Sequence, residues 1–303
     1  MLARASALVR DHPLLTPLLI VYAAINVVAG IFVYTPWLAP INLLLLVAYV
    51  SVIHFATRGR QLAMPDGRPP NARSRDFGLA TTVAVLQLAA VAVVWFLIIP
   101  HGLPKAWAAD LTAAGLPSLI AGKAANVALT IPLLLLPTLV AVACFRVRAR
   151  EVGLTVIPRD LALGVGLAAM GVGLALVSVA AGARPGLLWQ SASLPIVTAT
   201  TVLQSLSNGV PEELAFRGVI FGRLMPRLGR PGNSLALSAM VWGLFHVPML
   251  VVGSGLPIWV APFIGLFGAL QGLVYGYLFY RTRSIWPGAI WHTSNTSLGL
   301  IFL

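Results

Sequence analysis

Long apolar runs alternate along the chain with short polar stretches that are rich in arginine. A helix that spans a lipid bilayer needs roughly 20 apolar residues. The pattern predicts nine such helices, at about residues 14–34, 39–56, 77–99, 124–145, 161–182, 194–213, 234–250, 258–280 and 288–303. The last run has 16 residues and contains His, Ser, Asn and Thr, so we expect neighbouring helices to enclose it. The predicted fold is an all-α, polytopic transmembrane helix bundle.

Basic residues gather in alternate connections between these runs. Of the 20 Lys and Arg residues, 17 precede the first run or lie after the second, fourth, sixth and eighth. Only Lys105, Lys123 and Arg184 lie in the other connections. Cytoplasmic loops collect Lys and Arg. We therefore predict a cytoplasmic N-terminus and, with nine spans, a C-terminus on the opposite side.

The composition supports a membrane protein. The 303 residues are 59% hydrophobic and 9% charged, whereas soluble domains carry about 25% charge. The net charge of +12 is accounted for by the loop asymmetry, so we expect membrane lipids and no nucleic acid as partners. The first apolar run is longer than a signal-peptide core, which predicts an uncleaved span. Abundant Arg, Ala and Gly favour a bacterial plasma membrane.

The single cysteine, Cys144, excludes an internal disulfide and a cysteine-based zinc site. Gly268, Gly272 and Gly276 form two overlapping G-x-x-x-G steps in the eighth run. Small residues at this spacing let helix backbones approach closely. We therefore predict tight packing of the eighth helix against the helices that carry the chemistry, with a dimer interface as the alternative.

A pair of carboxylates, Glu212 and Glu213, follows directly from the sixth apolar run. The other six acidic residues lie in short polar stretches between apolar runs. Ionisable groups near hydrocarbon are costly unless paired and usually mark functional sites. Gln204, Asn208 and Glu212 are spaced four residues apart, so they share one face of a helix. This polar stripe is predicted to face a cavity or other helices.

Three further residues complete the candidate site. Arg217 can pair with Glu213 across one helical turn, which would leave Glu212 as the freer carboxylate and a general base for water. His246 and His292 interrupt two later apolar runs. Alone, an acid pair with an arginine also suits a helix end, and a lone membrane histidine suits a bond to a carbonyl. Three such intrusions in the last third favour a functional cluster.

These residues resemble three motifs of the CPBP family, the CAAX-protease and bacteriocin-processing group of membrane proteases. Glu212-Glu213-x-x-x-Arg217 is similar to the first motif. Trp242-x-x-x-His246 resembles the second, in which the family usually has Phe in place of Trp. The segment from Trp286 to Asn295 resembles the third. The resemblance covers roughly residues 194–303.

The resemblance implies an intramembrane endopeptidase. Glu212 and His246 would activate water, and His292 together with an asparagine four residues later would stabilise the oxyanion. Here that position is Thr296, and Asn295 stands one place earlier. On a helix both flank the face of His292. We expect Asn295 to act, because a threonine hydroxyl can instead bond its own backbone.

The predicted catalytic set is thus Glu212, Glu213, His246, His292 and Asn295, with Arg217, Trp242 and Thr296 in support. The depths of the two water-activating residues pose a difficulty. Glu212 lies about 27 Å along the sixth run, near its cytoplasmic end, whereas His246 lies about 18 Å along the seventh. A sixth helix that continues past Glu213, or a seventh that starts outside the hydrocarbon, would bring them level, and the apolar stretch 219–224 permits the first option.

The preferred hypothesis is a protease that hydrolyses peptide bonds of protein substrates near the cytoplasmic membrane face. Residues 1–193 would supply N-terminal transmembrane helices, and residues 194–303 the catalytic core. The alternatives are a non-catalytic scaffold or immunity-type protein that keeps the fold and, third, a transporter with a Glu/His proton relay. The sequence leaves the substrate and the oligomeric state open.

A bound metal is a further open question. Two histidines and a glutamate could hold zinc and leave a position for water. The chain has no His-Glu-x-x-His helix, and the family has been described both as metalloproteases and as glutamate-based enzymes. We therefore expect a glutamate mechanism without a cofactor, with zinc as the alternative.

Overall fold

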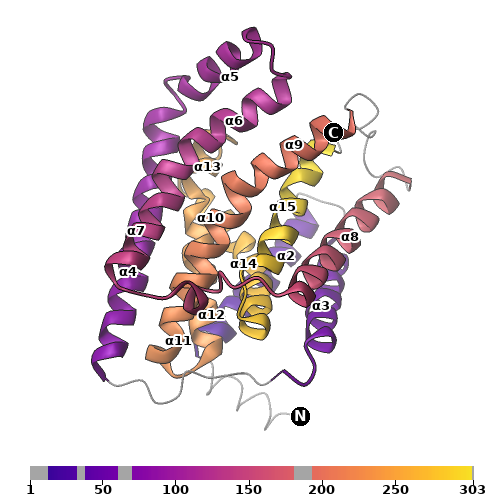
Figure 1. Cartoon of the computed structure of the whole chain (residues 1–303). Helices are drawn as coiled ribbons and strands as arrows, with labels where there is room; N and C mark the ends of the chain where they lie inside the picture. The colour runs from indigo at the N-terminus through magenta and orange to yellow at the C-terminus, as the bar shows by residue number, and fades with distance from the viewer. Residues whose placement is uncertain (1–12, 33–37, 61–69, 181–192, 302–303) are drawn as a thin grey trace.

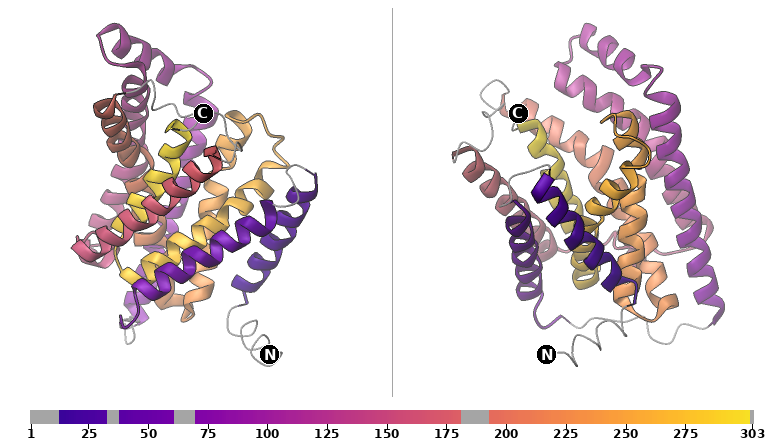
Figure 2. Two further views of the ribbon diagram at one scale, coloured as in Figure 1. Left: turned by 90° about the vertical axis from the view of Figure 1, so that its right-hand side faces the viewer. Right: turned by 180° about the vertical axis from the view of Figure 1, so that it is seen from behind.

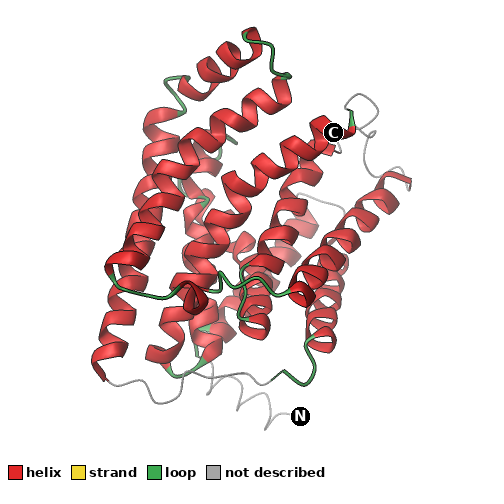
Figure 3. Cartoon of the chain, viewed as in Figure 1, coloured by secondary structure: helices red, strands yellow, loops and turns green. Residues whose placement is uncertain are grey.

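The computed structural model describes residues 13–32, 38–60, 70–180 and 193–301. Over these ranges every regular element is helical and there is no strand, which confirms the all-α prediction (Figures 1 and 3). The first half contains α2 (Leu15–Phe32), α3 (Leu38–Ala56), α4 (Pro70–Ala92) with η1 (Val93–Ile98), α5 (Leu103–Ala113), α6 (Ser118–Thr130), η2 (Ile131–Leu135), α7 (Leu136–Cys144), η3 (Ala149–Val152) and α8 (Pro158–Ala180). The second half contains α9 (Leu194–Gln204), η5 (Ser205–Gly209), α10 (Val210–Glu212), η6 (Glu213–Phe221), α11 (Gly222–Leu228), α12 (Pro231–Phe245), α13 (Val247–Val252), α14 (Ala261–Thr282) and α15 (Trp286–Ile301).

Five helical segments in the described part of the chain are long and apolar enough to cross a membrane. They are Ser74–Ile98, Ser118–Cys144, Pro158–Val177, Pro231–Val252 and Ala261–Thr282. The apolar helical stretches Leu15–Ala24 and Leu44–Ala56 are shorter. The chain is thus a helical membrane protein with several apolar helices, whereas the count of nine spans stays a prediction.

The predicted connection between the third and fourth runs contains a helix of its own. Helix α5 starts after Gly102 and ends before Gly115, and both glycines have positive φ angles (73° and 98°). Such angles are costly for residues with a Cβ atom and allow the chain to turn sharply. Helix α6 then begins at Ser118 rather than near residue 124, so Lys123 lies inside a membrane-length helix.

The sixth predicted helix does not end at residue 213. The chain stays helical from Leu194 to Leu228, through α9, η5, α10, η6 and α11. Pro211 lacks an N–H donor, and the helix accommodates it between two π-helical segments, η5 and η6. The stretch from Glu213 to Phe221 is buried throughout. Because this apolar segment is enclosed by other helices, it continues the helix past the acid pair instead of leaving the bundle.

Helix α14 packs closely against α12. Gly243 and Gly265 face each other, and a Cβ atom on Gly265 would lie 2.5 Å from the Gly243 carbonyl oxygen. Gly272 packs on Ala239 of α12 in the same way, and Gly276 packs on Leu235. The predicted packing of the eighth helix is therefore confirmed, although among its glycines Gly265 comes closest to the backbone of α12. Gly268, the first glycine of the predicted steps, has open space where a Cβ would stand.

The remaining helices enclose this central pair. Helices α2 and α3 lie on the outside of α12 and α14 (Figure 2). Helix α8 packs on α15, where a Cβ on Gly164 would lie 2.7 Å from the Cα of Pro287. Helix α4 packs on η6 and α11. Helix η6 thus lies at the centre of the molecule, with its Phe216 and Phe221 in the largest hydrophobic cluster.

Two acids outside the paired carboxylates are buried, which differs from their predicted place in polar connections. Asp76 Oδ1 lies 3.2 Å from Nη1 of Arg223, which also contacts Glu151 Oε2 at 3.2 Å. Asp160 Oδ1 pairs with Arg60 Nη2 at 2.6 Å. A buried charge is tolerated when it is paired. These ion pairs tie α4, η3 and α11 together and hold α8 to the end of α3.

The topology can be tested with reporter fusions. The α5–α6 hairpin lies at the opposite end of the bundle from the α11–α12 turn (Figure 1). From the distribution of basic residues, we expect reporters fused after Arg75, Arg150 and Arg230 to be cytoplasmic and those after Asp110 and Ser254 to lie on the other side. Paired reporters that are active only inside or only outside the cell would measure this. An external signal at Arg150 or Arg230 would contradict nine spans.

Candidate active site

The structure brings the predicted acids and histidines together. Glu212 ends α10 and Glu213 begins η6, His246 lies at the junction of α12 and α13, and His292 lies in the second turn of α15. Oε2 of Glu212 is 4.0 Å from Nε2 of His246 and 3.8 Å from Nε2 of His292. The difficulty of depth is thereby resolved, because the longer sixth helix carries Glu212 alongside α12.

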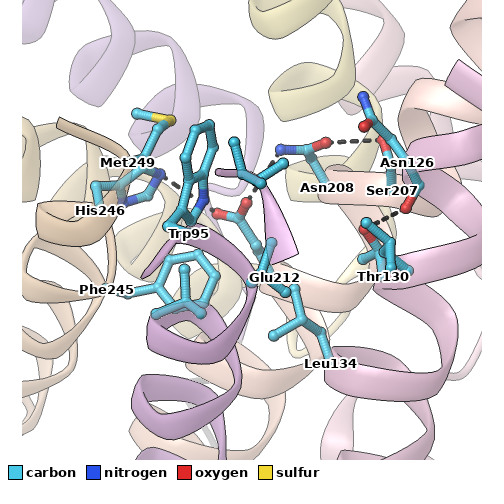
Figure 4. Close-up of a pocket in the computed structure, with 14 residues that line it drawn as sticks. Trp95, Asn126, Thr130, Leu134, Ser207, Asn208, Glu212, Phe245, His246 and Met249 are labelled. Carbon is cyan, nitrogen blue, oxygen red and sulfur yellow. Dashed lines mark hydrogen bonds and ion pairs between the residues drawn. The ribbon is translucent and has the colours of Figure 1, made fainter. Parts of the chain in front are cut away.

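Glu212 is buried among neutral hydrogen-bond donors. Its side chain is only 4% exposed. The indole Nε1 of Trp242 donates to Oε2 at 2.6 Å, and Nδ2 of Asn208 donates to Oε1 at 3.4 Å. Figure 4 shows the carboxylate between Asn208 and His246. A phenylalanine in place of Trp242 could not supply this indole donor, so the tryptophan itself holds the carboxylate.

His246 is held in one tautomer by the backbone. Its Nδ1 lies 2.8 Å from the carbonyl oxygen of Trp242. A carbonyl oxygen can only accept a hydrogen bond, so Nδ1 carries the proton. Nε2, which faces Glu212, is then left with a lone pair. The His246 side chain is 24% exposed, against 5% for His292, so His246 is the more accessible of the two histidines.

Glu213 forms an ion pair with Arg217 and also contacts His292. Its Oε1 lies 3.2 Å from Nη1 of Arg217, which confirms the predicted pair across one turn. The same oxygen lies 3.3 Å from Nδ1 of His292. The guanidinium carbon of Arg217 stands 4.9 Å from the ring centre of Trp242 and 5.2 Å from that of Tyr275. Arg217 is therefore fixed between an anion and two aromatic faces, as cation–π geometry favours.

His292 lies between the two carboxylates. Its Nδ1 faces Glu213 and its Nε2 faces Glu212. Its ring stacks on Tyr275, with centroids 5.0 Å apart and planes inclined by 21°. Both nitrogens and one ring face are therefore defined by contacts. Within the described ranges, no group of three or more His, Cys, Asp and Glu side chains is arranged as a metal site.

The displaced asparagine and its neighbour behave differently. The Thr296 hydroxyl lies 3.0 Å from the carbonyl oxygen of His292 and 3.1 Å from that of Thr293, so its own helix backbone satisfies it. Nδ2 of Asn295 donates to the hydroxyl of Tyr275 at 2.9 Å. Asn295 thus contacts the tyrosine that stacks on His292 rather than the carboxylates themselves.

Two cavities meet at His246. One, of about 200 Å³, is lined by Glu212, Asn208 and His246, with Trp95 and Met249 at its apolar side (Figure 4). The other, of about 340 Å³, is lined by His246 and Met249 together with residues of α12, α14 and α15, which include Trp242, Gln271, His292, Asn295 and Thr296. Since a water molecule takes about 30 Å³ of liquid volume, both cavities can hold several waters or part of a peptide.

Sequence reasoning missed Tyr275. Its side chain is fully buried, it stacks on His292, and its hydroxyl also accepts a hydrogen bond from Nε2 of Gln271 at 2.9 Å. A signal was present, because Gln271 and Tyr275 are two polar residues four apart in an apolar run, which places them on one helix face. Their partners on α15, however, cannot be read from that spacing.

Comparison with known proteins places this site in a family. Residues 194–298 match the family described as type II CAAX prenyl endopeptidase Rce1-like. No curated protein and no solved structure matches the chain. The matched segment contains Glu212, Glu213, Arg217, His246 and His292. This match confirms, over residues 194–298, the resemblance predicted from the three motifs.

Proposed function

We propose that this chain is an intramembrane endopeptidase that hydrolyses peptide bonds of protein substrates with water activated by Glu212 and His246. The observation that carries the proposal is the 4.0 Å approach of Glu212 Oε2 to His246 Nε2 inside a mostly apolar bundle. The match of residues 194–298 to a family of CAAX endopeptidases supports the same reaction class.

The gap between the two groups suits one water molecule. A separation of 4.0 Å is too long for a direct hydrogen bond. A water can hydrogen-bond to two atoms at this separation, because each of its bonds spans about 2.8 Å. The lone pair on His246 Nε2 would accept one of the water's protons and Glu212 the other. The water oxygen is then oriented with a lone pair toward the cavity.

The reaction follows general acid–base chemistry. Glu212 takes a proton from the water as its oxygen attacks the carbonyl carbon of the scissile bond, and the carbonyl oxygen becomes an oxyanion. The tetrahedral species collapses when the C–N bond breaks. The proton held by Glu212 then passes to the departing nitrogen, which leaves as an amine. The products are a carboxylic acid and an amine, and Glu212 returns to its starting state.

The other site residues stabilise the oxyanion or position the residue that does so. We assign oxyanion stabilisation to His292, whose Nδ1 is held by Glu213 and whose side chain lines the cavity of about 340 Å³. Preorganised donors of this kind are often the largest single catalytic contribution. Arg217 holds Glu213 at 3.2 Å, so it positions His292 through that carboxylate. Asn295 would add a second donor after it leaves Tyr275.

A glutamate mechanism is favoured over a zinc mechanism. Glu212 Oε2, the oxygen nearest both histidines, already accepts the indole proton of Trp242 at 2.6 Å. A zinc ion bound by Glu212, His246 and His292 would compete for that oxygen. We further propose that the site lies near the cytoplasmic face of a bacterial plasma membrane. The support for the cytoplasmic side is that α11 continues from η6 toward Arg227 and Arg230, and basic residues collect in cytoplasmic loops.

The first test compares membrane peptides from cells that express wild type, Glu212→Gln, His246→Ala or both changes. We expect each single variant to lose the products seen with wild type, a fall of about 10²–10⁴-fold in turnover. The double variant should be no worse than either single variant, because members of one catalytic unit are not additive. Quantitative proteomics of matched membrane fractions measures the products.

His101→Ala is the matched control, because His101 is exposed and lies outside the site. It should leave the products unchanged. Full product formation by Glu212→Gln would remove this carboxylate as the base and would favour a non-catalytic scaffold.

A second test separates Asn295 from Thr296. Removal of one oxyanion donor costs about 10²–10³-fold in turnover. We expect Asn295→Ala to lose activity on that scale, and Thr296→Val to lose much less, because the Thr296 hydroxyl is bonded to its own helix. Turnover is measured on an identified substrate at equal membrane levels. The reverse order would transfer the role to Thr296.

A third test concerns metal. We expect the purified protein to contain no stoichiometric zinc and to keep its activity after treatment with a chelator. A catalytic zinc site would instead contain about one equivalent and lose activity reversibly on chelation. Elemental analysis of wild type and His292→Ala decides the matter. Stoichiometric zinc that is lost in the variant would overturn the glutamate mechanism.

A further inference from the structure

A chain of hydrogen bonds leads from a lysine on α6 to Glu212. The ammonium of Lys123 donates to Oε1 of Gln204. Nε2 of Gln204 donates to Oδ1 of Asn208 at 3.0 Å. Nδ2 of Asn208 donates to Oε1 of Glu212 at 3.4 Å. The predicted polar stripe on the sixth helix is therefore one continuous relay, and its far end is a cation on another helix.

The lysine gives this relay its direction. A side-chain amide can turn either its oxygen or its nitrogen toward a neighbour, whereas an ammonium can only donate. Lys123 therefore draws the Gln204 oxygen toward itself and turns the Gln204 nitrogen toward Asn208. The oxygen of Asn208 must then face Gln204, so its nitrogen faces Glu212. Without the cation, only the carboxylate of Glu212 would oppose reversal of the two amides.

The other polar group beside the relay does not set its direction. The Ser207 hydroxyl lies 2.7 Å from Oδ1 of Asn208 and 3.2 Å from the carbonyl oxygen of Gln204. A hydroxyl both donates and accepts, so Ser207 adapts to either orientation of Asn208. The two groups of fixed polarity are the ends of the relay: the ammonium of Lys123 only donates, and the carboxylate of Glu212 only accepts.

The placement of Lys123 is unusual for a surface lysine. It lies five residues after the start of the membrane-length segment Ser118–Cys144, about 8 Å along the helix. A lysine near a helix end normally extends its ammonium toward water. Here the side chain is half-buried and its ammonium is bonded to Gln204 on the neighbouring helix. The other lysine of the chain, Lys105, is exposed on α5.

We propose that Lys123 is a positioning residue for Glu212, which acts by fixing the orientation of the Gln204 and Asn208 amides so that an N–H faces the carboxylate. The proposal rests on the proposed function only for its catalytic consequence. The direction of the relay is a property of the contacts themselves.

The kinetic test uses Lys123→Met, which keeps the length of the side chain and removes its donor. Small misplacements of a catalytic group can cost about 10²-fold in rate. We expect a 10- to 100-fold fall in kcat with little change in KM, because Lys123 lines neither cavity at the site. Lys105→Met is the matched control and should behave as wild type.

A relocated cation provides the rescue. In Lys123→Gln/Gln204→Lys the new lysine lies one turn before Asn208 and can donate directly to its oxygen. The nitrogen of Asn208 then still faces Glu212. We expect this double variant to recover most of the kcat that Lys123→Gln alone loses. A double variant that accumulates in the membrane but is no faster than Lys123→Gln would overturn the relay.

A second readout does not depend on activity. Lys123 and Asn208 are joined through Gln204, so their contributions to stability should be coupled if the relay exists. Melting temperatures of purified wild type, Lys123→Met, Asn208→Leu and the double variant measure this coupling. Non-additive losses support the relay, and additive losses overturn it.

These outcomes separate the two proposals. Wild-type kcat in Lys123→Met beside an inactive Glu212→Gln would overturn the positioning role and leave the protease intact. Unchanged products in Glu212→Gln would instead end the protease proposal. The melting-temperature cycle would then still decide whether the relay exists.

Discussion

Two adjacent carboxylates buried in an apolar bundle are the constraint on which the rest of the structure depends. Neither Glu212 nor Glu213 has more than a few per cent of its surface exposed. An uncompensated charge in such surroundings costs far more than a protein's net stability. Consecutive residues on a helix point about 100° apart, so the two acids face different neighbours. Glu213 meets Arg217 and His292, and Glu212 meets neutral donors and two histidines.

This division of partners separates charge balance from chemistry. The arginine is committed to Glu213 and enclosed by the rings of Trp242 and Tyr275. Glu212 therefore has no arginine or lysine in direct contact among the described residues, although the relay connects it to Lys123. A carboxylate held by neutral donors remains a better proton acceptor than one in a tight ion pair. The same arrangement that makes the acid pair tolerable in the bundle leaves one acid available for water.

Close helix approaches make these contacts possible. A Cβ on Gly288 would lie 2.6 Å from Oε2 of Glu213, and one on Gly209 would lie 2.9 Å from the carbonyl oxygen of Ala289. Helix α15 can thus come near enough for His292 to reach both acids. Gly243 and Gly265 do the same for α12 and α14, which carry Trp242 and Tyr275. Larger side chains at these positions would push the helices apart and would also move the site residues that they carry away from one another.

The sequence by itself determined the helical class, the acid pair, both histidines and the Arg217–Glu213 contact. Each of these follows from the length of an apolar run, from the cost of a charge within it, or from spacing along one helix. The tertiary structure alone decided how far the sixth helix continues, that Gly265 of α14 packs against the backbone of Gly243, and that Asp76 and Asp160 are buried. It also revealed Tyr275 beneath His292 and Lys123 at the end of the polar stripe. These features join residues on different helices, and helical periodicity relates only residues within one helix.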